Sequence, residues 1–383
     1  MNNKKNLGLY LHIPFCERKC LYCDFLSAAA DKETKDRYVK ALINEITSYK
    51  EWAQDYLVKT IFLGGGTPTS LSGENILKIM EAAGNTFFLD SDTEITIEAN
   101  PGTVDREKLL AFKEAGINRI SMGLQSADNR ELKLLGRIHT YETFAENYCL
   151  ARELKFDNIN VDLMSSLPGQ SLKDWMSTLK KVADLEPEHI SAYSLILEEG
   201  TYFYRKYSSL PLDEELDRQM YWETEHYLKD RGYRHYEISN YARDGRECRH
   251  NNSYWIRENY LGLGLGASSL IENTRFRKED NLEEYIRNAG DHALTDKEQE
   301  VLTVKQQMEE FMFLGLRLIQ GISKAAFQKS FHVTLENIYK EELDRSIKEG
   351  LLQENGDRLC LTDKGIDLSN TVMARFLLDS EIG

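Results

Sequence analysis

Three cysteines lie within eight residues, in the stretch Cys16-Glu-Arg-Lys-Cys20-Leu-Tyr-Cys23. The apolar run of residues 9–15 precedes them directly. A tight loop after a strand lets the three sulfurs converge on one point, so we interpret the cysteines as metal ligands. Soft thiolates favour zinc or iron-sulfur clusters.

The spacing leaves one metal position without a cysteine. Position 25 is Phe, and the next thiol along the chain is Cys149. A cubane 4Fe-4S cluster held by three cysteines keeps one iron free for a substrate. The alternative is a trio of packed or zinc-binding cysteines, although the spacing is not that of a paired zinc knuckle.

Strand-like and helix-like segments alternate from residue 7 to about residue 195. The expected strands are Leu7–Ile13, Thr60–Leu63, Glu94–Ile97, Arg119–Met122, Ile159–Met164 and His189–Leu195. Helical periodicity fills the intervals, with helix starts near Ser72, Asp105, Asn129 and Leu172. This alternation predicts an α/β fold with parallel pairing, either an open doubly wound sheet or part of a barrel.

Polar or glycine residues end successive expected strands. They are Cys16, Gly64 to Thr67, Glu98, Gln125 and Asp162. Ligands bind at the carboxyl ends of strands in both candidate architectures. We therefore expect the residues that end these five strands to lie together on one face of the sheet.

The cysteine loop resembles the signature of the radical S-adenosylmethionine (SAM) enzymes, Cys-x3-Cys-x-aromatic-Cys, with Tyr22 as the aromatic residue. The resemblance implies a partial (β/α)6 barrel and a 4Fe-4S cluster on Cys16, Cys20 and Cys23. In that family the open iron chelates SAM, and one electron cleaves the sulfonium to a 5′-deoxyadenosyl radical. An electron donor such as flavodoxin or ferredoxin is therefore expected.

The same resemblance assigns SAM contacts by motif position. Gly65 and Gly66 would bind the amino group, Glu98 the ribose hydroxyls and Arg137 the carboxylate. Read without the family, these residues fit a turn, a solvated carboxylate and a surface arginine equally well. The full set of implied SAM contacts is Tyr10, Tyr22, Gly65, Gly66, Thr67, Glu98, Gln125, Arg137 and Asp162.

Composition is that of an ordinary globular protein, with 41% hydrophobic and 29% charged residues. A formal charge of -15 repels phosphate backbones, so we expect no nucleic-acid partner. We find neither a signal peptide nor an apolar run long enough to span a bilayer, so we expect a cytosolic protein.

Six motifs occur in an order that resembles the oxygen-independent coproporphyrinogen III dehydrogenase group. They are Tyr-x-His-Ile-Pro-Phe-Cys, Gly-Gly-Gly-Thr-Pro-Thr, Ile-Glu-Ala-Asn-Pro, Met-Gly-Leu-Gln-Ser, Asp-Leu-Met-Ser-Ser-Leu-Pro-Gly-Gln and Gly-Leu-Gly-Leu-Gly-Ala. Within this group, His250-Asn-Asn-Ser-Tyr-Trp255 is similar to the haem-associated motif of the HemW-type haem chaperones. The resemblance makes His250 a haem ligand, since imidazole is a common axial ligand, with Cys248 and Cys149 as rivals. Read alone, a histidine beside aromatic residues is more often simple packing.

After residue 300 the alternation stops. We expect helices over 298–318, 324–331 and 335–349, a hairpin over 351–361 with an Asn-Gly turn, and a last helix over 363–378. This order suggests a winged-helix-like cap. Residues 1–300 thus form the barrel domain with the segment that carries His250, and residues 301–383 form the cap domain.

Three functions compete: the dehydrogenase, a haem chaperone that delivers haem to respiratory or membrane acceptor proteins, and another radical SAM enzyme acting on a tetrapyrrole. The dehydrogenase has an extra cysteine where this chain has Phe25, and an extension before the cluster that is absent here. Together with the His250 motif, this favours the chaperone, working in the cytosol or on the membrane surface. One departure is Ser268, where many HemW-like chains have histidine, so a haem role at that position does not transfer.

Overall fold

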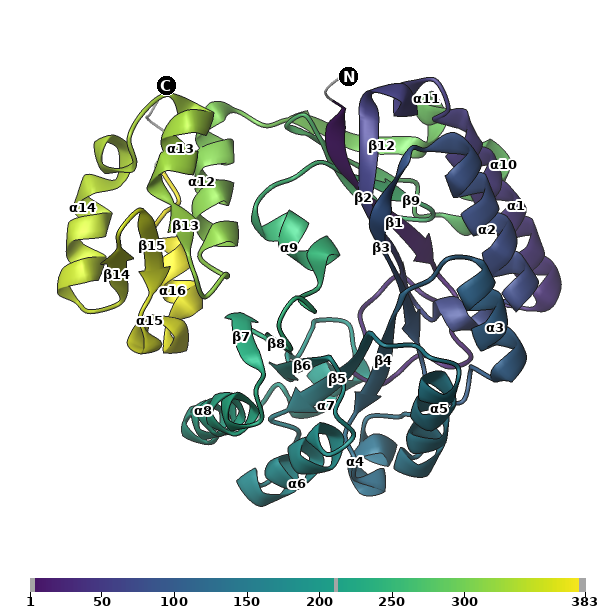
Figure 1. The fold of residues 1–383 in the computed structure, drawn as a ribbon, viewed down its shortest axis with the longest axis horizontal. Helices are drawn as coiled ribbons and strands as arrows, with labels where there is room; N and C mark the ends of the chain where they lie inside the picture. Colours follow the sequence, from purple (N-terminus) through teal and green to yellow (C-terminus); the bar gives the residue numbers. More distant parts are fainter. Residues whose placement is uncertain (1–3, 210–212, 379–383) are drawn as a thin grey trace.

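A computed structural model describes residues 4–209 and 213–378, and its main feature is one large mixed sheet (Figure 1). Six parallel strands follow one another in chain order at its centre. They are β1 (Lys5–Ile13), β2 (Tyr56–Gly65), β3 (Leu89–Ala99), β4 (Arg119–Gln125), β5 (Ile159–Ser165) and β6 (His189–Ser194). The α/β partial barrel predicted from the sequence is confirmed.

Helices connect these strands and cover the outer face of the sheet (Figure 1). They are α1 (Lys32–Ser48), α2 (Gly73–Thr86), α3 (Arg106–Glu114), α4 (Asn129–Leu134), α5 (Tyr141–Glu153) and α6 (Leu172–Ala183), with short 3-10 turns η1 (Trp52–Asp55) and η2 (Pro68–Ser70). Side chains cap the starts of α2, α3 and α6, at Ser72, Asp105 and Ser171. Apolar residues of both layers form one continuous core.

Residues 196–300 extend the sheet at both edges, an arrangement that the sequence did not reveal. Strands β7 (Arg234–Glu237) and β8 (Asn240–Ala242) follow β6, whereas β9 (Tyr260–Leu263), β10 (Ser268–Ile271), β11 (Thr274–Lys278) and β12 (Asp296–Val301) follow β1 on the other side. Helix α9 (Arg249–Trp255) carries the chain between the two edges (Figure 1). Helices α7 (Tyr202–Tyr207), α8 (Glu214–Asp230), α10 (Leu282–Asn288) and α11 (His292–Thr295) complete this segment.

The helix predicted over 298–318 starts six residues later in the structure, at Val304. Residues up to Val301 belong to β12, which pairs antiparallel with β11. Helix α12 (Val304–Gly315) starts only after Thr303, whose side chain forms a capping box with Gln306. The sheet edge offers backbone hydrogen bonds that override the helical preference of the charged segment before Thr303.

The C-terminal segment has its own small core and a three-stranded sheet. It contains β13 (Ile322–Ser323), α13 (Lys324–Phe331), α14 (Leu335–Lys348), β14 (Leu352–Asn355), β15 (Arg358–Leu361), α15 (Asp363–Asp367) and α16 (Ser369–Ala374). Helices followed by a hairpin give the predicted winged-helix-like order. The position of the domain boundary, residue 300, stays a prediction.

Two details of this segment differ from expectation. Asn355 pairs with Arg358, so the hairpin turn is Gly356-Asp357 and not Asn-Gly, with Gly356 at φ 62°. The expected last helix is two helices, because Leu368 has a non-helical backbone with φ -113° and ψ 23°.

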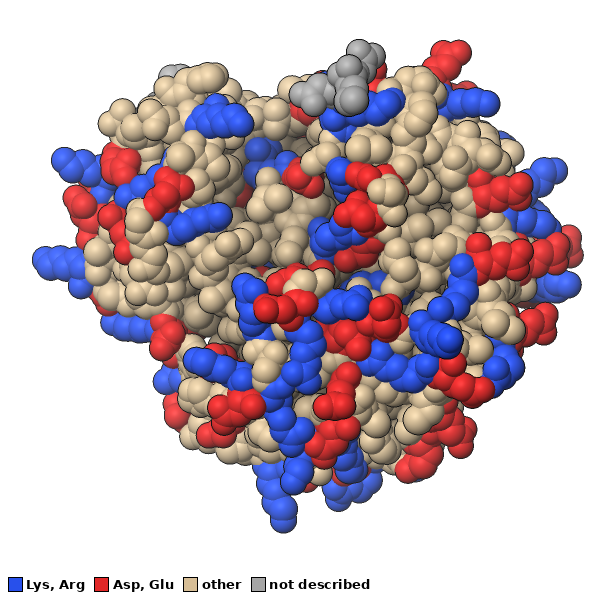
Figure 2. Space-filling model, viewed as in Figure 1, with Lys and Arg blue, Asp and Glu red and all other residues tan. Residues whose placement is uncertain are grey.

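Acidic and basic side chains are mixed across the face shown in Figure 2. None of the helices in the described ranges is long and apolar enough to cross a membrane.

Candidate functional site

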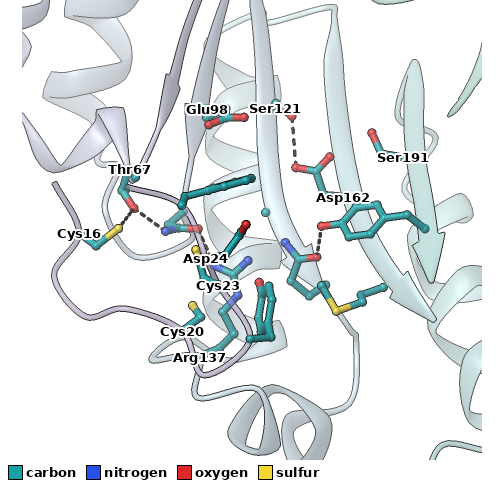
Figure 3. A pocket seen from close by; sticks show the side chains of 18 of the residues that line it. Cys16, Cys20, Cys23, Asp24, Thr67, Glu98, Ser121, Arg137, Asp162 and Ser191 are labelled. Carbon is teal, nitrogen blue, oxygen red and sulfur yellow. Dashed lines mark hydrogen bonds between the residues drawn. The ribbon is translucent and has the colours of Figure 1, made fainter. Parts of the chain in front are cut away.

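A cavity of about 470 Å³ opens at the carboxyl ends of the parallel strands. That volume suits a small-molecule ligand. Figure 3 shows cysteine sulfurs on one side of it and the carboxylates of Glu98 and Asp162 on the other. Most of the predicted site residues line it: Cys16, Cys20, Tyr22, Cys23, Gly65, Gly66, Thr67, Glu98, Gln125, Arg137 and Asp162.

The cysteine loop is held in place by backbone contacts at both of its ends. The Cys16 amide donates to the Ala28 carbonyl at 3.0 Å, and the Leu21 amide donates to the Leu135 carbonyl at 3.1 Å. The Cys16 sulfur accepts a hydrogen bond from the Thr67 hydroxyl at 3.5 Å. The loop is therefore fixed against β2 and the end of α4.

The three thiols share one pocket without forming a closed metal site. Burial raises the pKa of the Cys23 thiol, and nearby Cys20 and Cys16 add to that rise. Within the described ranges, no three Cys, His, Asp or Glu side chains converge closely enough to hold a metal ion. The donor set nevertheless fits an iron-sulfur group, because three soft ligands line the pocket without a fourth cysteine.

Two carboxylates line the same cavity. Glu98 accepts a hydrogen bond from the Gly65 amide at 3.1 Å, and Asp162 accepts from Asn160 at 2.7 Å and Ser121 at 3.3 Å. Burial, together with the charge of Asp162, raises the pKa of Glu98 to about 8. Burial also raises the pKa of Asp162. A cationic ligand, or one with several hydroxyl donors, would offset the free-energy cost of burying the two charged carboxylates.

Arg137 is the buried cation of the site, beside Arg18 and Lys19, which also line the cavity. Its Nη1 donates to Asn100 Oδ1 at 2.7 Å, and the guanidinium lies 5.9 Å from the centre of the Tyr22 ring. Its Nε is buried without a hydrogen-bond partner. A buried unpaired donor on a cation is well suited to receive a carboxylate.

The glycine segment lets the backbone approach the cavity. Gly65 has φ 113°, and a Cβ there would lie 2.5 Å from the His12 ring. A Cβ on Gly66 would lie 2.8 Å from the Phe15 carbonyl oxygen. Both positions therefore require glycine, and the segment that they form lines the cavity.

Several lining residues were missed by the sequence reasoning. Asn100 donates to the Thr67 hydroxyl at 2.7 Å, and Tyr193 donates to Gln125 Oε1 at 2.8 Å. Asn100 lies in the Ile-Glu-Ala-Asn-Pro motif at the end of β3, which was a usable signal. Other missed lining residues are Ser121, Ser191 and Asn240.

Two predicted site residues do not line the cavity. The Tyr10 hydroxyl is hydrogen-bonded to His12 Nδ1 at 3.0 Å, behind the glycine segment. His250 has an exposed fraction of 1% and lies inside the barrel. In this structure neither residue reaches the cavity.

The ring of His250 is fully engaged by the protein. Nδ1 is 2.8 Å from the Thr60 hydroxyl, and Nε2 is 2.7 Å from the Tyr254 hydroxyl. The ring also stacks on Phe62 with centroids 5.2 Å apart. Burial, with the charge of Arg119 as a second cause, lowers the pKa of His250 to about 3. In this conformation neither nitrogen is free for a haem iron.

Comparison with known proteins agrees with this geometry. Residues 10–182 match the radical SAM superfamily, and residues 302–368 match the HemN C-terminal domain. The heme chaperone HemW of Bacillus subtilis is 37% identical, covering 96% of this chain and 98% of the relative. The HemW of Lactococcus lactis is 36% identical, covering 98% of both chains. The chain belongs to the HemW family.

A solved structure supports the fold of this HemW-family chain. The structure of HemN, the coproporphyrinogen III oxidase of Escherichia coli and a radical SAM enzyme, superposes with a TM-score of 0.86. The match covers 98% of this chain and 90% of that one, at 24% identity. At this identity the likeness establishes the architecture and leaves the activity open.

Proposed function

We propose that this HemW-family protein binds a 4Fe-4S cluster and SAM in the cavity and carries haem to acceptor proteins. The observation that supports it best is the shared cavity, which combines the cysteine loop, the glycine segment, the carboxylates of Glu98 and Asp162 and the guanidinium of Arg137. Cys16, Cys20 and Cys23 would hold the cluster. When bound, such a cluster can supply one electron to SAM.

The chain's own groups match the parts of SAM. Arg137 offers its unpartnered Nε to the carboxylate, and the backbone of Gly65 and Gly66, which lines the cavity, would receive the amino group. Glu98 is available to ribose hydroxyls, and the two buried carboxylates favour a positively charged sulfonium. These residues would bind and orient the ligand.

Haem is the cargo in this proposal. The relatives that match over nearly the whole chain carry the name heme chaperone HemW. The acceptors would be haem proteins of the respiratory chain or membrane, met from the cytosol or the membrane surface. A flavodoxin or ferredoxin would reduce the cluster.

The second candidate function is oxidative decarboxylation of coproporphyrinogen III. It is considered because HemN, which shares this architecture, carries the name coproporphyrinogen III oxidase. Against it, Phe25 occupies the place of the extra cysteine expected of the dehydrogenase and is 59% exposed at the cavity.

One experiment separates the two functions. The protein is purified anaerobically, its cluster is reconstituted, and haem titration is run beside a coproporphyrinogen assay with SAM and a reductant. We expect stoichiometric haem binding and no decarboxylation. Decarboxylation without haem binding would replace the chaperone with the dehydrogenase.

A further inference from the structure

A layer of polar side chains lies inside the barrel, where β4, β5 and β6 run side by side. In this layer Asn160 is in register with Ser121 and His189, and Asp162 is in register with Ser191. Every second residue of a strand points to the same face, so all five side chains share one face of the sheet. Asp162, Ser121 and Ser191 line the cavity. Asn160 and His189 lie behind them, with exposed fractions of 2% and 1%.

The side-chain amide of Asn160 is the centre of this layer. Its Nδ2 donates to Asp162 Oδ1 and to the Ser121 hydroxyl, each at 2.7 Å. Its Oδ1 accepts from His189 Nδ1 at 2.6 Å and from the Ser191 hydroxyl at 3.1 Å. An amide has two N–H donors and one oxygen with two acceptor sites, so every hydrogen-bonding position of Asn160 is used. These four bonds hold the amide in one orientation.

The hydrogen bonds of this layer are directed toward Asp162. A carboxylate only accepts, so Asn160 presents its nitrogen to Asp162 and its oxygen to His189. His189 then donates from Nδ1, and its Nε2 accepts from the Tyr236 hydroxyl at 2.7 Å. Burial lowers the pKa of His189, with the charge of Arg119 as a second cause, so the ring is neutral and holds one proton. Tyr236, His189 and Asn160 thus form a chain of donors that ends on the carboxylate.

This donor chain opposes the cost of burying the charge of Asp162. Burial raises the pKa of Asp162, and the hydrogen bond from Asn160 is the strongest of the interactions that lower it. The hydroxyl of Ser191, the charge of Arg119 and the hydroxyl of Ser121 add to this effect. Without the Asn160 donor, the Asp162 carboxyl would take up a proton more readily and would no longer attract a cation.

The charge of Asp162 reaches the ligand space. Its carboxylate lines the cavity and, after burial, is the second cause of the raised pKa of Glu98 (Figure 3). A cation bound there would be attracted by this charge, whereas a neutral ligand of the same shape would not. SAM carries such a cation, its sulfonium. S-adenosylhomocysteine is the same molecule without the methyl group and the charge.

We propose that Asn160 and His189 are positioning residues that present Asp162 to the ligand as a carboxylate, so that the cavity selects the sulfonium of SAM over the neutral thioether of S-adenosylhomocysteine. This inference rests on the proposed SAM binding and names what sets its specificity. Neither residue touches the ligand, and both act through Asp162.

Isothermal titration of the anaerobically reconstituted full chain tests this proposal. The readout is the ratio of the dissociation constants of S-adenosylhomocysteine and SAM. Both ligands offer the same amino, carboxylate and ribose groups, so damage to the fold or the cluster weakens both alike. Asp162→Asn keeps the shape of the side chain and removes its charge, so it should lower the ratio about tenfold.

The donor chain is tested by variants that leave Asp162 in place. Asn160→Leu removes the donor and keeps most of the volume, and Asn160→Ala removes the donor and the volume. Each should lower the ratio at least about threefold, because Asp162 loses a hydrogen bond to its charged form. His189→Leu acts one step further away and should lower the ratio about twofold to threefold.

Two variants serve as matched controls. His189→Asn keeps an amide N–H near the position of Nδ1, so it should restore most of the ratio that His189→Leu loses. His235 on β7 is hydrogen-bonded outside the donor chain, to the Ile238 carbonyl at 3.2 Å and the Tyr221 hydroxyl at 3.3 Å. His235→Leu should therefore keep the native ratio. Urea unfolding and iron and sulfide analysis confirm the fold and the cluster content of each variant.

The possible failures are distinguishable. An equal loss of affinity for both ligands in the folded Asn160 variants would refute the positioning role, and so would a native ratio in these variants. A native ratio in Asp162→Asn would refute selection by charge. Absence of SAM binding in the unaltered, reconstituted protein would refute the proposed SAM function itself.

Discussion

The two ends of the barrel use similar polar residues with opposite results. At the carboxyl end, Glu98 and Arg137 face a cavity. The protein gives Arg137 Nε no hydrogen-bond partner and leaves the charge of Glu98 unfavourably buried. At the amino end, helix α9 fills the barrel, and we call this helix the plug. Both ring nitrogens of its residue His250 are hydrogen-bonded. Residue type does not distinguish a ligand site from a structural plug. What differs between Arg137 and His250 is their hydrogen bonding, because Arg137 Nε has no partner and both ring nitrogens of His250 have one.

The plug is built around a buried carboxylate. Glu94 accepts the amides of Arg249 and His250, each at 3.1 Å, at the start of α9. Nearby, His189 bonds Asn160 at 2.6 Å and Tyr236 at 2.7 Å. This layer stabilises the barrel below the cavity, and a ligand would have to break it to enter.

The largest effect is expected from the cysteine loop. Replacing Cys16, Cys20 and Cys23 with serine should abolish reconstituted iron and sulfide, because no other soft ligand set lines the cavity. Iron and sulfide analysis measures this. Cys149→Ser removes an exposed thiol and should retain the full content. Equal cluster loading in the triple variant would place the cluster elsewhere.

The plug predicts that His250 acts through stability. His250→Ala leaves Thr60 and Tyr254 without partners and opens a buried space, so it should lower the free energy of unfolding by about 3 kcal/mol. Urea unfolding measures the loss. The exposed His226→Ala is the control and should change stability by less than about 0.5 kcal/mol. A stable His250→Ala protein would show that α9 does not hold the barrel.

The cavity predicts that Glu98 and Arg137 act through binding. Glu98→Ala and Arg137→Ala should each weaken SAM affinity about tenfold or more, from a lost charge-assisted contact of roughly 1.5 to 3 kcal/mol. Isothermal titration of the reconstituted protein measures this, with cluster content unchanged. Arg130→Ala, at an 85% exposed side chain on α4, is the control. Native SAM affinity in both cavity variants would mean that the cavity binds another ligand.

A smaller effect follows from the pKa of His250, about 3 in the folded protein against an ordinary 6.5. Between pH 3 and pH 6.5, His250 binds a proton in the unfolded chain but not in the folded protein. The stability that the neutral, buried ring contributes is therefore fully present above pH 6.5 and is lost as the pH falls. From pH 7 to 5.5 the loss from this one group is about 1 kcal/mol. His250→Gln should lose less stability than the unaltered protein over this range, as urea unfolding at both pH values shows. Parallel losses would mean that His250 titrates normally.

The sequence predicted the residues of the cavity better than the contacts of helix α9. The cavity residues follow strands whose periodicity is local, so Cys16, Glu98 and Asp162 could be placed on one face. The partners of His250 are not local: Thr60 lies 190 residues away. Trp255 likewise meets α16 only through the packing of the C-terminal segment. The edge pairing of β12 was hidden for the same reason, since its partner strand decides its conformation.

Anaerobic reconstitution tests the central claim most directly. Iron, sulfide and zinc are counted in the purified chain, and the spectrum of the reduced cluster is recorded with and without SAM. We predict about four irons and four sulfides per chain, and a spectrum that changes when SAM binds the open iron. Stoichiometric zinc without sulfide, or a cluster indifferent to SAM, would contradict the account.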